Sequence, residues 1–185
     1  MKFTQVNAIV LKRVNVGEAD RILVVYSKEL GKIKVIAKGV RKITSRRAAH
    51  LEVFSQVNMI IRNSKTLPYV GEVSSLYSFT TLHKSFRKIA IAYHLSEILD
   101  RILPSHEKNE YVYNMFASFL KALDKESANE TVRSNVRYFV HDMLSHLGYL
   151  KKTSQFTYSQ LLGEVESVIE RPLATVNLLH TISRS

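Results

Sequence analysis

The stretch GEADRILVVYSKELGKIKVIAKGVRK, residues 17–42, decides the fold of this chain. It holds two β-type runs, Ile22–Ser27 and Lys32–Lys38, and Gly31 closes the KELG segment between them. Glycine suits the left-handed position of a hairpin loop. The second run alternates as a strand does, with Ile33, Val35 and Ala37 on one side and Lys32, Lys34 and Lys38, with Ile36, on the other. We therefore predict a hairpin in which one face of the second strand carries lysines.

Three further strands are predicted around this hairpin. One covers Val6–Lys12, and another contains Val57, Met59 and Ile61 in alternation with mostly polar residues. A fifth run, Leu67–Tyr77, contains Pro68 and Gly71, which favour an edge or bulged strand. The longer connection Gly39–Phe54 has room for a short helix. Five strands in about eighty residues favour an OB-fold barrel, which typically binds nucleic acid on one face.

After residue 80 the apolar period becomes helical. Pro104 ends the first predicted helix, Asn129 and Gly148 bound the third, and a short fifth is expected over Thr175–Ile182. The apolar stripes of the first four are Ile91, Leu95, Ile98 and Ile102; Val112, Phe116, Phe119 and Leu123; Val132, Val136, Val140, Met143 and Leu147; and Tyr158, Leu161, Val165 and Val168. We interpret them as core. The predicted fold is α+β, with a five-stranded OB-fold barrel over residues 1–80 and an all-helical domain over 81–185.

Positive charge is concentrated in the first part of the chain. The 185 residues carry 27 Lys and Arg against 16 Asp and Glu, a formal net charge of +11. Residues 1–80 hold 14 basic and 5 acidic residues, whereas residues 81–185 hold 13 and 11. A basic surface can serve solubility alone, but solubility does not require segregated charge. The segregation favours a polyanionic partner for the barrel.

The densest basic cluster is KGVRKITSRR, residues 38–47. Lysine and arginine attract phosphates without sequence preference, and single strands also need flat groups on which bases stack. The predicted DNA-binding residues are Lys12, Arg13, Arg21, Lys34, Lys38, Arg41, Lys42, Arg46 and Arg47. The aromatic candidates for stacking, wherever they are not buried, are Tyr26, Phe54, Tyr69 and Tyr77. An anionic membrane surface is the alternative partner, but no amphipathic basic helix accompanies the cluster.

Sequence signals for an enzyme or a metal site are weak. The chain has no cysteine, which excludes disulfides and cysteine-based zinc sites, and His141 and His146 are five residues apart and point in different directions. Glu18 and Asp20 could form the carboxylate pair of a metal-dependent nuclease, but a turn hydrogen bond or an ion pair with Arg21 is the simpler explanation. We predict no catalysis, no cofactor and no membrane segment, and a cytoplasmic location.

Residues 17–57 resemble the N-terminal barrel of the RecO family of recombination and repair proteins. The residues that carry this resemblance, in order and spacing, are Gly17, Glu18, Asp20, Arg21, Gly31, Ala37, Lys38, Gly39, Arg41, Ser45, Leu51 and Phe54. The segment FVHDMLSHLGYL, residues 139–150, is similar to the family's helix that ends in Leu-Gly-Tyr. The segment ERPLATVNLLHTI, residues 170–182, is similar to the family's C-terminal Arg/Lys-Pro-Leu helix.

This resemblance implies a mediator of DNA repair and homologous recombination. Members of the family bind single- and double-stranded DNA, anneal complementary strands and help load the recombinase RecA on protein-coated single strands. The implied partners are RecR and the acidic C-terminal tail of single-stranded DNA-binding protein, and the implied location is the nucleoid. An OB-fold RNA-binding protein remains an alternative, because phosphate attraction is common to both nucleic acids. A metal-dependent nuclease is the other alternative.

The resemblance further implies a protein-partner site on the third helix. Arg137 matches an arginine that the family uses, beside an apolar pocket, to hold the acidic tail. Arg133 lies four residues earlier and thus on the same helix face. Many members carry a four-cysteine zinc module after the Leu-Gly-Tyr helix, whereas here Lys151–Phe156 leads almost directly to the final helices. The shorter segment puts in doubt any partner contact that such a module makes.

Overall fold

The computed structural model describes residues 3–125 and 129–175 of the chain. Its internal contacts separate two compact units. One unit comprises Met1–Phe79 and Pro104–Ala117, and the other comprises Thr80–Leu103 and Ser118–Ser185. Residues 104–117, which follow a long helix in the sequence, therefore group with the strands.

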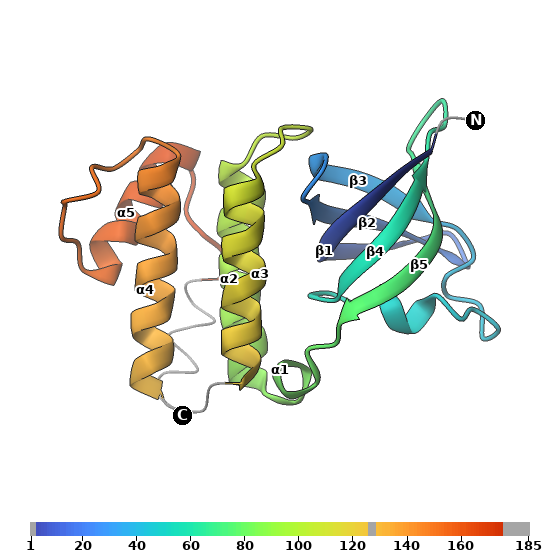
Figure 1. Cartoon of the computed structure of the whole chain (residues 1–185), viewed down its shortest axis with the longest axis horizontal. Coiled ribbons are helices and arrows are strands. Elements are labelled where there is room, and N and C mark those ends of the chain that lie inside the picture. The colour runs from blue at the N-terminus through green and yellow to red at the C-terminus, as the bar shows by residue number, and fades with distance from the viewer. Residues whose placement is uncertain (1–2, 126–128, 176–185) are drawn as a thin grey trace. The chain divides into compact units, whose positions relative to one another are not determined.

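Five strands close into a barrel in the first unit (Figure 1). They are β1 (Phe3–Val16), β2 (Asp20–Ser27), β3 (Gly31–Ala37), β4 (Gln56–Arg62) and β5 (Tyr69–Tyr77). Their order is β1-β2-β3-β5-β4, and β4 pairs with β1 to complete the ring. Every pair is antiparallel except β3 with β5, which meet in parallel at Ile36 and Tyr69. This is a five-stranded OB-type barrel, so the predicted α+β fold is confirmed.

The alternation predicted for β3 and β4 is confirmed by burial. Ile33, Val35 and Ala37 of β3 lie in the barrel core together with the apolar residues of β4, which are Val57, Met59 and Ile61. Gly31 has a left-handed φ of 68°, as the hairpin loop requires. A side chain there would also overlap the carbonyl group of Glu107. The β2–β3 turn thus needs glycine both for its backbone angle and for this close contact.

The last strand and the long connection also agree with the predictions made from the sequence. β5 begins directly after Pro68, and its register with β4 slips between Met59 and Ile61. The strand is therefore bulged, and it is not an edge because it pairs on both sides. The connection between β3 and β4 holds one short 3-10 helix, η1 (Ala48–His50).

Helices make up the second unit, with the start of one helix grouped with the barrel. They are α1 (Thr80–Lys84), α2 (Phe86–Ile102), α3 (Glu110–Lys125), α4 (Asn129–His146) and α5 (Tyr158–Ile169). The predicted stripes of α2 and α3 are buried throughout, as are those of α4 and α5 except at Leu147, Tyr158 and Val168. The side chain of Asn129 and the helix expected over Thr175–Ile182 lie outside the described residues, apart from Thr175 itself.

Local capping explains where two of these helices begin. Ser85 accepts the backbone N–H of Lys88 and starts α2, while Thr157 and Gln160 form a reciprocal capping box at the start of α5. α2 ends at Ile102, two residues before Pro104, as the sequence predicts. No helix within residues 3–125 and 129–175 is long and apolar enough to cross a membrane.

Candidate nucleic-acid interface

The outer surface of β1, β2 and β3 carries an apolar strip between lysines. Lys12 pairs with Val24, and Val24 pairs with Lys34, so these three residues form one row across the strands. A second row runs from Val14 through Ile22 and Ile36 to Tyr69. Since the neighbouring residues Leu23, Val25 and Val35 face the core, both rows face outward. We call these two rows the outer face.

A bulge in β1 places Lys12 on this face. Val10 pairs with Val25 and points into the core, but the next pair joins Lys12 to Val24. Leu11 is therefore an extra residue, and it exchanges the two sides of the strand beyond it. Without the bulge, Lys12 and Val14 would follow Val10 into the core.

Tyr69 supplies an aromatic group at one end of the outer face. It is half-buried, and the Nζ of Lys38 lies 5.5 Å from the centre of its ring. This distance fits a cation–π contact and holds one positive charge beside a flat apolar surface. Val14 adds an exposed aliphatic side chain to the same row. The arrangement offers apolar contact to bases and positive charge to phosphates.

The outer face is covered at its end beyond the row of Lys12, Val24 and Lys34. Tyr26 pairs with Lys32 in the next row, but it is fully buried and donates its hydroxyl to the carbonyl oxygen of Asn109 at 3.0 Å. Burial raises the pKa of Tyr26 well above its usual value. The backbone N–H of His106 also donates to the carbonyl oxygen of Lys32. The connection between α2 and α3 thus closes this end to a ligand.

Of the four aromatic candidates for stacking, Tyr69 has the best position. Tyr26 and Phe54 are buried, so they are not available to bases in the folded barrel. Tyr77 is half-buried, and its ring centre lies 4.7 Å from that of Phe79. Ile36 and Ile22 belong to the outer face, although sequence reasoning did not assign them to the site. The signal was present, because Ile36 interrupts the lysine side of β3.

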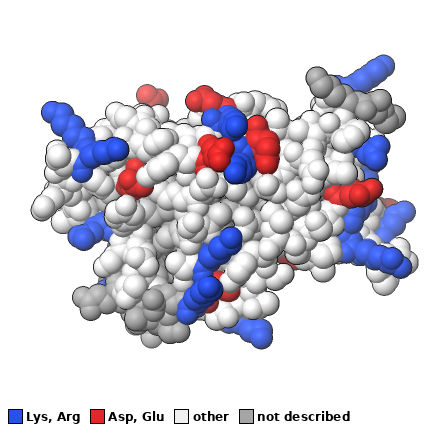
Figure 2. Space-filling view, viewed as in Figure 1, with Lys and Arg blue, Asp and Glu red and all other residues white. Residues whose placement is uncertain are grey.

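The basic loop, residues 38–47, is fixed to the barrel at both ends. Gly39 donates its N–H to Asp20 Oδ1 at 2.7 Å, and Arg41 donates its backbone N–H to Ala19 at 2.9 Å. Arg47 donates to the carbonyl oxygens of Lys38, Val70 and Gly71. Figure 2 shows basic side chains gathered over the barrel near this loop. Besides Lys38, the exposed cations of the loop are Arg41, Lys42 and Arg46.

Arg13 and Arg21 lie apart from the outer face. Both guanidinium groups pair with the carboxylate of Glu52, which reduces the positive charge that they present to a ligand. Arg21 also donates to the side-chain oxygen of Asn15 at 3.2 Å. The predicted DNA-binding residues therefore fall into three groups: the lysines of the outer face with Lys38, the loop cations, and an arginine pair held by Glu52.

Asp20, one of the two carboxylates considered for a nuclease, has a structural role. Asp20 accepts the N–H of Gly39, 19 positions away, so this hydrogen bond fixes the next loop rather than the turn of Asp20 itself, and Arg21 pairs with Glu52 rather than with Asp20. Within residues 3–125 and 129–175, no group of three or more metal-ligating side chains comes together. The four thiolates of the family's zinc module are absent because the chain has no cysteine, so these residues do not fit that ion.

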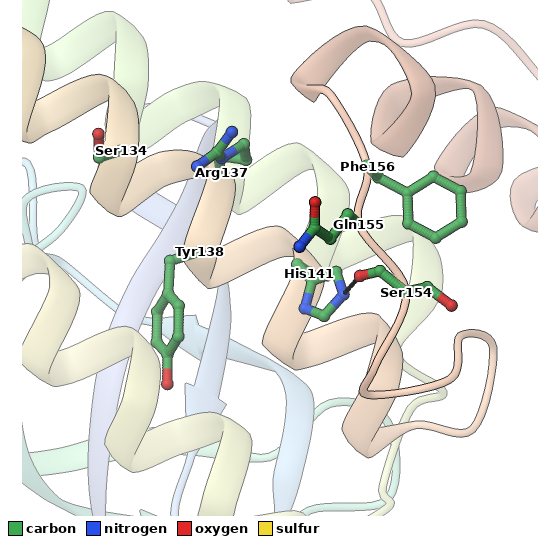
Figure 3. Close-up of a pocket in the computed structure, with 7 residues that line it drawn as sticks. All are labelled: Ser134, Arg137, Tyr138, His141, Ser154, Gln155 and Phe156. Carbon is green, nitrogen blue, oxygen red and sulfur yellow. Dashed lines mark hydrogen bonds between the residues drawn. The ribbon is translucent and has the colours of Figure 1, made fainter.

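The second unit contains a pocket of about 370 Å³ between α4 and the segment before α5 (Figure 3). Its lining residues are Ser134, Arg137, Tyr138, His141, Ser154, Gln155 and Phe156. His141 donates Nε2–H to the carbonyl oxygen of Ser154 at 2.9 Å, which fixes the segment against α4. Both Arg137 and Arg133, one turn earlier, are exposed, but only Arg137 lines the pocket.

A buried polar cluster fixes the chain beyond α5 to α2. His94 is fully buried, with Tyr158 Oη 2.6 Å from its Nε2 and Thr175 Oγ1 2.7 Å from its Nδ1. Thr175 donates its hydroxyl to Glu97, so Nδ1 of His94 carries the proton and Nε2 accepts from Tyr158. Burial lowers the pKa of His94 to about 4, against a smaller opposing effect of Glu97. The neutral imidazole is thus part of the packing.

Two family models match the chain. The model described as "Recombination protein O N terminal" matches residues 1–79, which contain the barrel strands. The model described as "Recombination protein O C terminal" matches residues 83–154, which run from α1 to the pocket segment. Both matches belong to one family, and together they cover most of the chain.

Three curated relatives of the chain share one name. "DNA repair protein RecO" of Roseiflexus sp. (strain RS-1) is 30% identical over 142 residues, which are 77% of this chain and 49% of that protein. The protein of the same name from Pelotomaculum thermopropionicum is 29% identical over 160 residues, or 86% and 61% of the two chains. One from Dehalococcoides mccartyi is 29% identical over 92% of this chain and 62% of its own length.

The chain spans about half to three fifths of the length of these relatives. The matches nevertheless cover both of its units, and the closed barrel agrees with the fold that the resemblance implied. The family of all three relatives is one of DNA repair and recombination. The chain belongs to the RecO family.

Proposed function

We propose that this chain binds single- and double-stranded DNA through its barrel and anneals complementary strands, as a mediator of recombination and not as an enzyme. The observation that carries the proposal is the outer face, where the row of Lys12, Val24 and Lys34 lies beside an apolar row that ends at Tyr69, and Lys38 Nζ lies over the Tyr69 ring. A single strand on this face can bring bases to the apolar row and phosphates to the lysines.

The basic loop supplies a second set of phosphate contacts. Arg41, Lys42 and Arg46 are exposed on a loop whose ends are fixed by Asp20 and Arg47. Phosphate contacts of this kind give affinity without sequence preference, and released counterions make that affinity depend on salt. Two cationic surfaces on one barrel can lower the repulsion between two DNA backbones. Bases outside the apolar row stay free to pair.

The pocket beside α4 supports a protein partner on the second unit. Arg137 can take a terminal carboxylate in bidentate fashion, while Phe156 and Tyr138 offer apolar contact to a tail's aromatic residue. We propose that this pocket binds the acidic C-terminal tail of single-stranded DNA-binding protein. A mediator in this family also contacts RecR and helps load the recombinase, and we extend both roles to this chain. DNA binding then places the chain at the nucleoid.

An annealing assay tests the proposal. Two complementary oligonucleotides carrying a donor and an acceptor fluorophore are mixed with the full chain, with and without single-stranded DNA-binding protein. We expect faster annealing with the wild-type chain. Lys12→Glu combined with Lys34→Glu should abolish the acceleration, because each change replaces a phosphate contact with repulsion.

Lys151→Glu combined with Lys152→Glu, which changes two exposed lysines of the second unit, is the matched charge control and should leave annealing unchanged. Equal annealing by the double variant and the wild type would remove the outer face from the proposal. An RNA oligonucleotide that competes far better than DNA of the same sequence would favour the RNA-binding alternative. Magnesium-dependent cleavage of the oligonucleotides would favour a nuclease.

A further inference from the structure

The apex of the basic loop carries a fully exposed isoleucine. Ser45 donates its N–H to the carbonyl oxygen of Lys42 at 2.9 Å, which closes a four-residue turn with Ile43 and Thr44 at its centre. Ile43 is exposed over its whole surface. Both central residues are β-branched, whereas such turns favour Gly, Pro, Asn, Asp and Ser. An isoleucine at position 43 therefore contributes neither to the hydrophobic core nor to the stability of the turn.

The loop holds this side chain away from the barrel. Val40 is buried and anchors the incoming side, and Arg47 fixes the outgoing side through three carbonyl oxygens. Between these anchors the turns at Gly39–Lys42 and Lys42–Ser45 follow each other directly. Because both ends of the loop are fixed, the apex loses little conformational entropy when it binds a ligand.

Cations surround the exposed isoleucine. Arg41 and Lys42 precede it, Arg46 follows, and all three are exposed. Phosphate contacts by these residues would bring the Ile43 side chain to a DNA backbone and its adjacent base edges. Proteins that bend DNA insert aliphatic side chains of this kind between base steps, next to cationic contacts.

We propose that Ile43 is a wedge that inserts between DNA bases whose stacking is already interrupted, such as those at a mismatch or a nick. This inference rests on the proposed binding of DNA by the barrel. The free energy needed to unstack an intact step is at least as large as that gained by burying one isoleucine. One isoleucine can therefore insert only at base steps that are already unstacked, where this free energy is not needed. The chain would thus recognise discontinuous duplexes without reading sequence.

An anionic membrane is the other ligand that could take a basic loop with an apolar apex. One isoleucine buries too little apolar surface for stable attachment, since even a single myristoyl chain gives only marginal binding. The loop is also short, and it connects strands of a nucleic-acid-binding fold. Both features favour DNA.

The test compares the wild-type chain with Ile43→Ser and Ile43→Leu on labelled DNA. Anisotropy titrations use a matched duplex, the same duplex with a two-base mismatch, a nicked duplex and a single strand. We expect the wild type to bind mismatched and nicked duplexes about five- to tenfold more tightly than the matched one. Ile43→Ser should lose this preference and Ile43→Leu should keep it. The neighbouring Thr44→Ala is the matched control and should also keep it.

A second readout reports insertion directly. A 2-aminopurine base beside the mismatch should brighten on binding of the wild type and of Ile43→Leu, and should not brighten with Ile43→Ser. A preference that survives in Ile43→Ser overturns the wedge alone, provided that salt-sensitive DNA binding persists. Wild-type chain that binds none of the four DNAs overturns the proposed function itself. Binding to phosphatidylglycerol vesicles that Ile43→Ser abolishes would assign the residue to a membrane instead.

Discussion

The guanidinium group of Arg47 donates to the carbonyl oxygen of Val70 at 2.8 Å, across 23 positions of sequence. Two further hydrogen bonds, to Gly71 and Lys38, make this side chain the brace between the basic loop and β5. The adjacent Arg46 is exposed. Two neighbouring arginines of the same cluster thus have different environments, and this difference can be measured.

Substitution of the two arginines should separate stability from DNA affinity. Arg47→Ala removes three hydrogen bonds from a charged donor and should cost about 2–3 kcal/mol of unfolding free energy. Arg46→Ala should change stability by less than about 0.5 kcal/mol but weaken binding to all DNA sequences alike. Urea unfolding and anisotropy titration measure the two effects. Equal stability of the two variants would exclude the bracing role of Arg47.

The loop cations should determine part of the salt dependence of DNA binding. If the wild type neutralises about five to eight phosphates, the slope of log K against log salt on single strands is roughly −4 to −6. Replacing Arg41, Lys42 and Arg46 with alanine should flatten this slope by about 2 units. Titrations at several salt concentrations measure it. A slope that does not change would remove these three residues from the interface.

Replacing the arginine of the α4 pocket should impair peptide binding. Arg137→Ala should weaken binding of a fluorescent acidic tail peptide by about 1.5–3 kcal/mol, because a charged hydrogen-bond pair is lost. Arg133→Ala is the matched control one turn away, and it should have a smaller effect since Arg133 lies outside the pocket lining. Binding of naked DNA should stay near the wild-type value in both variants. If both variants bind the peptide normally, the tail site lies elsewhere.

The buried histidine should make the second unit sensitive to acid. His94 has a pKa of about 4 in the folded chain against an ordinary value of 6.5, so the unfolded chain binds more protons between these pH values. The contribution of neutral His94 to the unfolding free energy should therefore be fully present above pH 6.5. It should fall toward pH 4 by up to about 3 kcal/mol. Glu97 also has a lowered pKa, despite the opposing effect of burial, through hydrogen bonds from Thr175 and Ala174 and the charge of Arg101. The stability that the ionised carboxylate of Glu97 contributes is lost at a lower pH than that of His94.

A variant separates the two groups. His94→Gln cannot titrate, so its unfolding free energy should change little between pH 6.5 and 5, whatever its absolute value. Urea unfolding followed by helical circular dichroism gives this profile. An identical pH profile for the variant and the wild type would exclude His94 as the source.

The barrel strands and the long helices could be predicted because their signals are local. Ile33, Val35 and Ala37 alternate in the sequence as they do in the barrel, and Pro104 follows the end of α2 closely. The division into domains at residue 80 stays a prediction. The return of residues 104–117 to the barrel could not be foreseen, since it depends on contacts such as that of Tyr26 with Asn109.

The candidate site was harder to predict, for physical reasons. The bulge at Leu11 decides that Lys12 faces outward, and no residue in that run marks a bulge. Glu52 is far from Arg13 and Arg21 in sequence, so its partial neutralisation of their charge is visible only in the fold. The sequence composition indicated an excess of positive charge on the barrel. It could not show which cations hold the loop in place and which can contact a ligand.

The cover over Tyr26 limits how much of a strand the barrel can occupy. A DNA strand that crosses from the apolar row over the row of Lys12, Val24 and Lys34 meets the α2–α3 connection beyond it and has to leave the sheet. We therefore expect an occluded length near the lower end of the range for OB folds, about four nucleotides for each chain on the outer face. The nucleotides on either side of such a short site stay uncovered and form gaps between neighbouring molecules. A complementary strand can begin pairing in those gaps before any molecule of the protein dissociates.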